Sequence, residues 1–274
     1  MNWSSFQNNL VLISWDGKEE PLVNLLTDAQ PHFMLLVFDY SGQADRPQGL
    51  DDNYLFFSQK TACKGEILKC LAPYLKQQSQ QCQYIGLIDD DVVISIRQIN
   101  EALQLASSLG CLSFSPSLHP DDSTFVTHML SRGNSTARRV DWVELKMSFV
   151  RSDLFMATAP FYPLSYSGYG IDCFVHPYFA KVFGLDGEIY VFDHIVVRDF
   201  RPHRSGFMRF KNGLTGLEEA RRLHKLCLSH LLNERPNLIR DPTIRRVLHL
   251  QRLKLLIQDI NQIEDYRPEL DSEA

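Results

Sequence analysis

The sequence lacks the cysteine spacings that mark a disulfide framework or a zinc site. Its six cysteines include no CxxC pair, and a disulfide scaffold is unusual in a chain of 274 residues. It also lacks a basic stretch followed by an apolar core near its start, and no apolar run approaches the ~20 residues that cross a bilayer. We therefore expect a cytoplasmic protein with reduced, mostly buried thiols and with neither a secretory signal nor a membrane-spanning helix.

The formal net charge of −5 conceals an uneven distribution. Residues 201–254 contain 13 Lys and Arg against 4 Asp and Glu, a local balance of +9, which leaves −14 for the rest of the chain. Such a basic segment suits an anionic partner, such as phosphate or lipid headgroups, but a solvated helical surface is the simpler explanation. No aromatic or helical readout motif accompanies the basic residues, so we expect no nucleic-acid partner.

Short apolar runs alternate with helical patterns in the first half of the chain, and hydrophobic residues make up 44% of the whole. The runs, typical of buried parallel strands, cover 9–15, 33–38, 54–57, 84–88 and 111–115, the last ending at Pro116. The helical patterns cover 20–26, about 61–75 and about 95–107. This order predicts an α/β fold with a mostly parallel sheet covered by helices, in which ligands bind beyond the carboxyl ends of the strands.

The second half of the chain is less regular. A polar stretch at 119–139 has no clear period and predicts a loop that could serve as a flexible lid. Strand-like alternation returns at 140–157. A helix is predicted at 174–183, with Pro177 in its first turn, and a strand at 188–197.

After Gly213 the pattern is helical, in two pieces that separate near Arg235 and Pro236. We therefore divide the chain into a main domain at 1–213 and a C-terminal helical extension at 214–274 that packs on it.

Acidic residues stand at the carboxyl ends of three predicted strands. Asp16 follows the first strand, Asp39 the second, and Asp89, Asp90 and Asp91 the fourth. Three adjacent carboxylates oppose one another's ionisation, and a divalent cation shared with a diphosphate would remove that cost. In the alternative interpretation, Asp91 caps the next helix and Asp89 is a solvated turn residue, but a cap needs only one aspartate.

The segment Leu87–Asp91 resembles the DxD motif of GT-A-fold glycosyltransferases, and the order of elements resembles that fold from about Asn9 to Arg204. The resemblance implies a Rossmann-type mixed, mostly parallel sheet. It also implies an enzyme that moves a sugar from a nucleotide-diphosphate donor, of the UDP type, to a hydroxyl acceptor in polysaccharide or glycoconjugate synthesis. By position, the resemblance implies that Asp89 contacts the nucleotide ribose or the metal ion and that Asp91 binds Mn²⁺ or Mg²⁺ on the donor diphosphate.

The same resemblance implies further contacts with the nucleotide sugar. They fall on Asp16, Asp39, Lys60, Lys64 and Asp90. For the two lysines, a solvated helix start is the alternative.

Residues Gly168–Asp172 resemble the glycine-aromatic-glycine-x-acid element that opens an acceptor-side helix in inverting GT-A enzymes. The resemblance implies that Asp172 is the base that removes the proton from the acceptor hydroxyl. An ordinary helix N-cap is the alternative, and the two roles are compatible.

A distal metal ligand is the least certain part of this pattern. The resemblance places a histidine just before an Arg-Pro pair, and this sequence has Asp199 there. Asp199 is itself a competent ligand for Mn²⁺ or Mg²⁺, while His203 and His194 are alternatives, His194 more simply an ordinary residue. Arg198, Arg201 and Arg204 are candidates to neutralise a leaving diphosphate.

The segment 241–263 combines a helix start with apolar and basic residues. It suits packing on the domain or on a second copy of the chain, and it would also suit contact with a membrane surface, which for a cytoplasmic protein would be the inner membrane.

Two other functions stay open. One is a sugar-1-phosphate nucleotidyltransferase, although no glycine-rich loop follows the first strand. The other is a non-catalytic GT-A-like binding protein, which Asp199 in place of histidine keeps open.

Overall fold

The computed structural model describes residues 9–17, 25–47, 54–79, 81–124, 126–133, 135–199 and 207–250. Several expectations fall outside these ranges: most of the helix expected at 20–26, the candidate ligand His203, Arg201 and Arg204, and the part of the C-terminal helix beyond residue 250.

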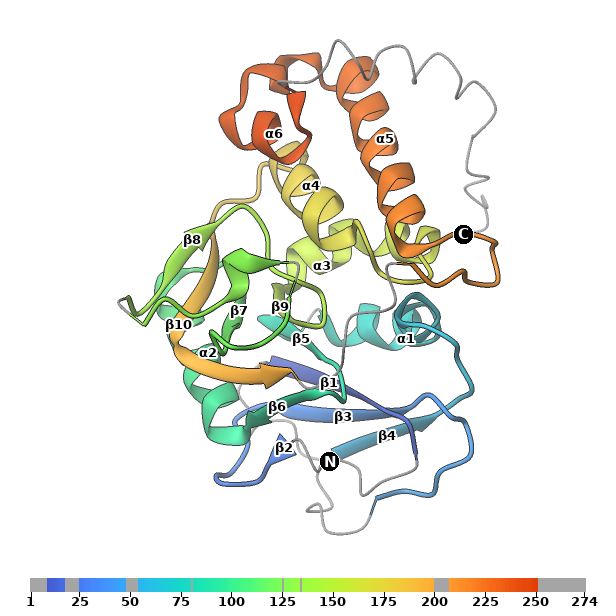
Figure 1. Cartoon of the computed structure of the whole chain (residues 1–274), viewed down its shortest axis with the longest axis vertical. Helices are drawn as coiled ribbons and strands as arrows, with labels where there is room; N and C mark the ends of the chain where they lie inside the picture. The colour runs from blue at the N-terminus through green and yellow to red at the C-terminus, as the bar shows by residue number, and fades with distance from the viewer. Residues whose placement is uncertain are drawn as a thin grey trace.

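Ten strands within the described residues form one mixed sheet (Figure 1). They are β1 (Asn9–Trp15), β2 (Leu25–Leu26), β3 (Met34–Asp39), β4 (Tyr54–Ser58), β5 (Tyr84–Ile88), β6 (Val92–Ser95), β7 (Ser113–Leu118), β8 (Arg138–Val140), β9 (Met147–Arg151) and β10 (Ile189–Asp199). The order is β2-β6-β10-β7-β9-β5-β1-β3-β4, with β8 paired to β10. Strands β5, β1, β3 and β4 run parallel, and antiparallel β9 joins them to the parallel pair β7 and β10. The predicted fold class is confirmed.

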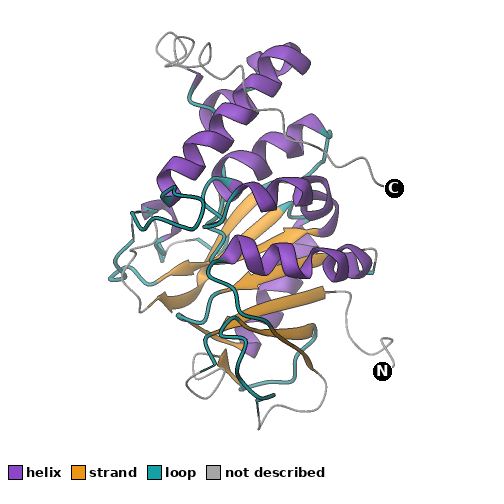
Figure 2. Cartoon of the chain, turned by 90° about the vertical axis from the view of Figure 1, so that its right-hand side faces the viewer, coloured by secondary structure: helices purple, strands orange, loops and turns teal. Residues whose placement is uncertain are grey.

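Helices cover both faces of this sheet. They are α1 (Lys64–Ser79), α2 (Ile96–Leu109), α3 (Ser152–Thr158), α4 (His176–Val182), α5 (Gly216–Glu234) and α6 (Pro242–Val247), with short turns η2 (Thr127–Met129), η3 (Ala159–Leu164), η4 (Ile171–Val175) and η5 (Pro236–Arg240). Helix α2 packs in one hydrophobic cluster, and α1, α3, α4, α5 and α6 share the other. Figure 2 shows most helices gathered above the strands.

Strand β1 shows how the sequence divides its core between the two faces. All seven residues are buried, and because successive side chains of a strand point to opposite faces, Leu10 and Leu12 enter the α1 side while Val11 and Ile13 enter the α2 side. A continuous apolar run is what a strand buried on both faces requires. For the same reason β1 and β5 have the bounds that the sequence predicts.

Two predicted elements need correction, and one strand was not predicted. The alternation at 140–157 ends at Arg151, and residues 152–158 form helix α3, because Leu154 and Phe155 bury one helical face rather than alternating. Strand β6 was not predicted, since Val92–Ser95 is short and follows the aspartates directly. Residues Leu25 and Leu26 form strand β2, which pairs with β6, instead of the end of a helix.

Strand β7 continues past Pro116 to Leu118, where the sequence predicted an end. Pro116 faces Phe192 of β10, and the register of that pair shifts between Phe192 and Val196. Proline has no backbone N–H and cannot donate a hydrogen bond to the neighbouring strand. The irregular pairing in β10 therefore accommodates Pro116 inside the sheet, because a bulge interrupts the regular hydrogen bonds there.

Hydrogen bonds tie the described residues of the polar stretch at 119–139 to the sheet, and its movement as a lid stays a prediction. The Asp193 carboxylate, fully buried in β10, accepts bonds from Arg138 (Nε at 3.0 Å and Nη2 at 3.0 Å), from Ser135 Oγ at 2.7 Å and from the Arg132 N–H at 3.2 Å. Arg138 also donates to the carbonyl oxygens of His128 and Leu130. One internal carboxylate thus organises this loop.

The C-terminal helices pack on the sheet domain. A capping box of Thr215 and Glu218 opens α5, and Asp241 caps α6. Residues Ile244 and Val247 of α6 are buried in the same cluster as β1 and α1, so the described part of the predicted amphipathic segment packs on the domain.

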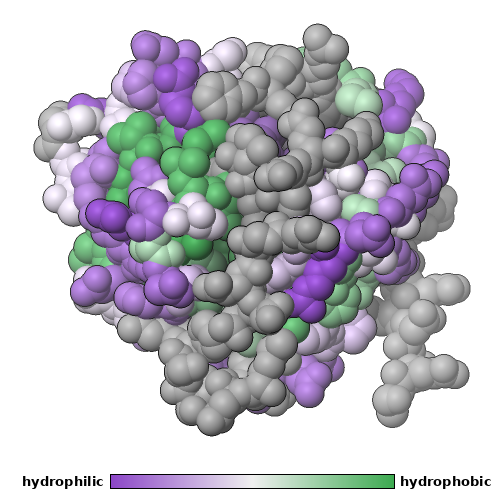
Figure 3. Space-filling view, turned by 90° about the horizontal axis from the view of Figure 1, so that it is seen from below, coloured by the Kyte–Doolittle hydropathy of each residue, from purple (hydrophilic) through white to green (hydrophobic). Residues whose placement is uncertain are grey.

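Within the described residues, no helix combines the length and the apolar character that crossing a membrane requires. All six cysteines are free, Cys111 and Cys227 buried and the others half-buried. From below, the described surface mixes hydrophilic and hydrophobic areas, with hydrophobic residues gathered on the left (Figure 3).

Replacing Asp193 with asparagine should lower the free energy of unfolding by about 3 kcal/mol, because the Arg138 guanidinium, 13% exposed, loses its carboxylate partner. Urea denaturation measures the change, with Asp121→Asn, whose side chain is 82% exposed, as the matched control. Equal stability of the two variants would show that Asp193 does not organise the loop.

Candidate active site

The carboxyl ends of β1, β3, β4 and β5 meet at one edge of the sheet because these strands are parallel neighbours. Two glycines let the loops beyond them touch. A Cβ atom on Gly17 would lie 2.6 Å from Ser41 Oγ, and one on Gly42 would lie 2.3 Å from the Lys60 nitrogen. Asp16, half-buried, therefore sits beside the loop that follows Asp39, as the sequence predicts for a shared edge.

Asp39 holds its own loop together. Its buried carboxylate accepts bonds from the N–H groups of Ser41, Gln43 and Ala44 and from Ser58 Oγ at 2.7 Å. Burial alone would raise the pKa of Asp39, but these hydrogen bonds outweigh it and hold the pKa below its usual range. The structure gives Asp39 a clear role in shaping the edge, while its contact with a nucleotide stays a prediction.

The three consecutive aspartates after β5 have different surroundings. Lys64 Nζ lies 2.8 Å from Asp89 Oδ2, and the Tyr40 hydroxyl donates to Asp90 Oδ2 at 2.9 Å. The Oδ1 atom of Asp91 is buried and has no hydrogen-bond partner. Lys64 is therefore part of the acidic site rather than a solvated helix start, whereas Lys60 is exposed.

The surroundings of Asp91 disfavour its ionised form. Burial raises its pKa to about 6, and the nearby carboxylates of Asp89, Asp199 and Asp90 act in the same direction. An unpartnered buried carboxylate oxygen is unfavourable unless a cation or donor reaches it.

Asp199 reaches the same cluster from the end of β10, which runs parallel to β5. Its carboxylate accepts a short hydrogen bond from Lys146 Nζ, which also lies 3.3 Å from Glu144 Oε2. The Lys146 side chain is only 8% exposed. Burial opposes its charge, but Glu144 and Asp199 outweigh burial and hold the pKa of Lys146 above its usual range.

The segment Glu144–Lys146 connects the two halves of the site. The Asp89 N–H donates to the Lys146 carbonyl at 2.8 Å, and the Leu145 N–H donates to Asp172 Oδ2 at 3.1 Å. One backbone stretch therefore touches both the aspartates of β5 and the candidate base.

Asp172 lies in the π-turn η4, 9% exposed. Burial raises its pKa to about 6, and the Glu144 carboxylate contributes, while N–H groups of Leu145 and Cys173 oppose the shift. Neither η4 nor α4 has a side-chain cap, so Asp172 does not act as the N-cap that the sequence left open.

Other candidates lie farther from these contacts. His194 bonds to the Thr136 carbonyl and to Glu101 of α2, in agreement with an ordinary structural role. Arg198 pairs with Asp122, which also accepts the Asp199 N–H at 2.9 Å. Its contact with a diphosphate stays a prediction.

Sequence reasoning missed Lys146, Glu144 and Tyr40. A signal existed for Lys146, because it interrupts the apolar run of Leu145 and Met147, where a charge needs a buried partner. Tyr40 directly follows Asp39 and offered no comparable signal.

Among the described residues, no group of three or more His, Cys, Asp or Glu side chains is arranged to hold a metal ion. Lysine ammonium groups are bound to Asp89 and Asp199 instead. The donor set nevertheless fits Mn²⁺ or Mg²⁺, because carboxylate oxygens are the ligands these ions prefer and the orphaned Oδ1 of Asp91 needs a positive partner.

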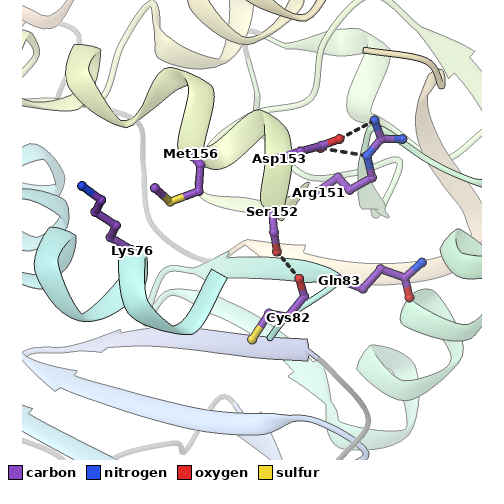
Figure 4. A pocket seen from close by; sticks show the side chains of 7 residues that line it. All are labelled: Lys76, Cys82, Gln83, Arg151, Ser152, Asp153 and Met156. Carbon is purple, nitrogen blue, oxygen red and sulfur yellow. Dashed lines mark hydrogen bonds and ion pairs between the residues drawn. The ribbon is translucent and has the colours of Figure 1, made fainter. Parts of the chain in front are cut away.

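A separate pocket of about 490 Å³ lies at the opposite end of β5 (Figure 4). It is lined by Lys76, Cys82, Gln83, Arg151, Ser152, Asp153 and Met156. Arg151 pairs with Asp153 across its rim. None of the predicted site residues lines it.

No protein-family model matches the sequence, and no curated protein sequence matches it. Among solved structures, the chain is similar to residues 1–349 of TarS from S. aureus in complex with UDP-GlcNAc, with a TM-score of 0.55 and 13% identity over 93% of this chain and 76% of that chain. It is also similar to TarS 1–349 in complex with UDP, with a TM-score of 0.54 and 14% identity over 96% of this chain and 76% of that one.

A third similar structure is GalNAc-T7 with UDP, GalNAc and Mn²⁺, with a TM-score of 0.51 and 10% identity over 93% of this chain and 58% of that chain. At such low identities the likeness concerns the fold. The chain has the GT-A fold of these glycosyltransferases, as the DxD-like segment led us to expect.

Replacing Asp91 with asparagine should stabilise the metal-free protein at pH 7.5. The pKa of Asp91 is raised from 3.8 to about 6, so folding favours its protonated form, and stability is lost as the pH rises from about 4 to 6. Asparagine removes the charge, and we expect a gain of about 1–2 kcal/mol at pH 7.5 and little gain at pH 4. Urea denaturation in EDTA at both pH values measures it, with Asp121→Asn as control. A loss of stability at pH 7.5 would contradict the electrostatic account.

Proposed function

We propose that this chain is a metal-dependent glycosyltransferase that moves a sugar from a nucleotide-diphosphate donor to a hydroxyl acceptor. The observation that carries the proposal is the convergence, at one edge of a GT-A sheet, of Asp89, Asp199 and Asp91, whose Oδ1 is buried without a hydrogen-bond partner. Asp172 is attached to this edge through the Glu144–Lys146 segment. We place the activity in polysaccharide or glycoconjugate synthesis.

The donor would bind at the acidic edge, the edge of the sheet where Asp89, Asp91 and Asp199 lie. TarS binds UDP-GlcNAc and UDP, and GalNAc-T7 was solved with UDP and Mn²⁺, so a UDP-type donor is the natural first substrate to test. Asp91, Asp89 and Asp199 would hold Mn²⁺ or Mg²⁺. When bound, that ion neutralises the diphosphate and stabilises it as a leaving group. Asp16, Lys60 and Asp39 complete the proposed nucleotide edge.

Two lysines belong to this edge as well. The ammonium of Lys64 already neutralises part of the charge on Asp89, and it would also bind a donor phosphate. Lys146 keeps Asp199 aligned with the cluster and offsets the Glu144 carboxylate. Their positive charges allow the carboxylates to gather before the donor arrives.

Asp172 would act on the acceptor side. A carboxyl group with a pKa of about 6 is ionised at pH 7 and is a stronger base than an ordinary aspartate. Its carboxylate would take the proton of the acceptor hydroxyl as that oxygen attacks the anomeric carbon of the donor sugar. The bond between this carbon and the diphosphate oxygen then breaks, and the nucleoside diphosphate leaves. Transfer in one displacement inverts the anomeric configuration.

A GT-A-like protein that binds the donor without transferring the sugar is the second candidate, and Asp199 in place of the expected histidine keeps it open. The two tests below separate the candidates, because a binding protein would hold UDP but release no sugar. A cytoplasmic location, with contact at the inner membrane or pairing of two copies through the C-terminal helices, stays a prediction.

Wild-type protein should bind UDP in the presence of Mn²⁺, and Asp91→Asn should weaken that binding by about 100-fold, because it removes one anionic metal ligand. Isothermal titration calorimetry of UDP with and without Mn²⁺ measures the affinity. Since Asp91→Asn is expected to be more stable than the wild type, unfolding does not explain the loss. Unchanged UDP affinity would remove Asp91 from the metal site.

Asp172→Asn should retain UDP affinity and lower the rate of sugar release by about 10²–10⁴-fold, because the amide accepts no proton. Release of UDP from UDP-GlcNAc, with water or a panel of saccharides as acceptor, gives the rate. In the wild type the rate should fall as the pH drops through about 6 and level off above it, since the base must be ionised. Full activity of Asp172→Asn would exclude it as the base.

A further inference from the structure

Glu219, in the first turn of α5, is a fully buried carboxylate, whereas its neighbour Glu218 is half-buried. Burial of a carboxylate is costly unless hydrogen bonds satisfy it. Its helical position does offer a clue, because Glu219 stands four residues before Leu223 and eight before Cys227, on the apolar face of α5.

The donors to Glu219 come almost entirely from one loop. Oε1 accepts the Tyr166 N–H at 2.9 Å, and Oε2 accepts the Ser167 N–H at 2.8 Å and a bond from Ser167 Oγ. Ser165 Oγ lies 3.2 Å from Oε2. Outside this loop, Asn212 Nδ2 donates to Oε1 at 2.7 Å.

The loop that Glu219 holds runs directly into the candidate base. Residues 165–168 lead to Gly170, where an added Cβ would lie 2.8 Å from Ala220 Cα of α5. The Gly170 carbonyl then accepts the N–H groups of Phe174 and Val175 in the turn that carries Asp172. Helix α5 therefore touches this loop at two successive points.

On its other side the loop packs against the donor edge. The Gly65 N–H of α1 donates to the Tyr166 carbonyl at 2.8 Å, and an added Cβ on Gly168 would lie 2.8 Å from the Leu145 side chain and 3.5 Å from Lys64 Cδ. The loop is thus enclosed between α5 and the residues that contact Asp89 and Asp172.

We propose that Glu219 is a positioning residue: it fixes the 165–170 loop so that Asp172 and the half-buried Tyr166 and Tyr169 present one preformed face to the acceptor. The inference rests on the proposed function of Asp172. It makes the C-terminal helical extension a structural part of the acceptor side, whereas the donor edge is built from the sheet and α1.

Glu219→Gln is the informative variant. Its amide places an NH₂ group against N–H donors, so either Tyr166 or Ser167 loses its acceptor. Asn212→Ala is a milder second variant, because Asn212 is exposed and contributes one bond to Glu219. Glu234→Gln, an exposed carboxylate at the other end of α5, is the matched control. All measurements are made well below each variant's thermal midpoint.

The first measurement is amide hydrogen exchange of the ligand-free proteins. We expect peptides covering 165–170 to exchange about 10-fold faster in Glu219→Gln and no faster in Glu234→Gln. Exchange equal to the wild type in Glu219→Gln would overturn the proposal. This measurement needs no nucleotide sugar, so it decides the role of Glu219 in ordering the loop even if the wild type neither binds nor cleaves UDP-GlcNAc, which would instead refute the proposed function.

The second measurement separates donor binding from turnover. We expect Glu219→Gln to lower the rate of UDP release from UDP-GlcNAc by about 10-fold or more, and Asn212→Ala by about 3-fold, with UDP affinity within twofold of the wild type. A turnover rate equal to that of Glu234→Gln would overturn the proposal. A parallel loss of UDP affinity would overturn it too, because the effect would then not be confined to the acceptor side.

Discussion

The concentration of carboxylates at one edge of the sheet is the constraint on which the rest of the site depends. Parallel strands bring their carboxyl ends together, so the topology that gathers Asp89, Asp91 and Asp199 also makes them repel one another. The half-buried Lys64 and the buried Lys146 offset part of this repulsion through ion pairs with Asp89 and Asp199. The remaining charge falls on Asp91, whose orphaned oxygen makes it the point where an added cation gains most.

The short segment Glu144–Lys146 connects this edge to Asp172, on the proposed acceptor side. Its backbone accepts a hydrogen bond from the Asp89 N–H and donates one to Asp172, and the Lys146 side chain holds Asp199. Burial raises the pKa of Asp172, and the Glu144 carboxylate adds to this shift. The proposed donor and acceptor groups therefore share one support next to β9. A change in this segment would disturb both functions at once, whereas Glu219 acts on one of them.

The sequence predicted the parts of the fold that depend on local pattern. Strands β1 and β5 are continuous apolar runs. Because the two strands are parallel neighbours, the aspartates that follow them lie at the same edge of the sheet. It could not predict α3, because the apolar spacing of residues 152–158 is compatible with either structure. The local pattern hints that Lys146 and Glu219 are buried, but it could not identify the groups that bond to them, since these partners lie more than 50 positions away along the chain.

The order in which the chain is synthesised determines when the contact between Glu219 and the 165–170 loop can form. Glu219 leaves the ribosome 52 positions after Ser167, which at about 5–20 residues per second takes roughly 3–10 s. During that interval the strands β1, β3, β4 and β5 are already available, but the loop that carries Asp172 has no anchor on its outer side. Asp199 is also made before α5, so every carboxylate of the edge precedes Glu219, and the contact that anchors residues 165–170 on this outer side can form only once α5 has been made.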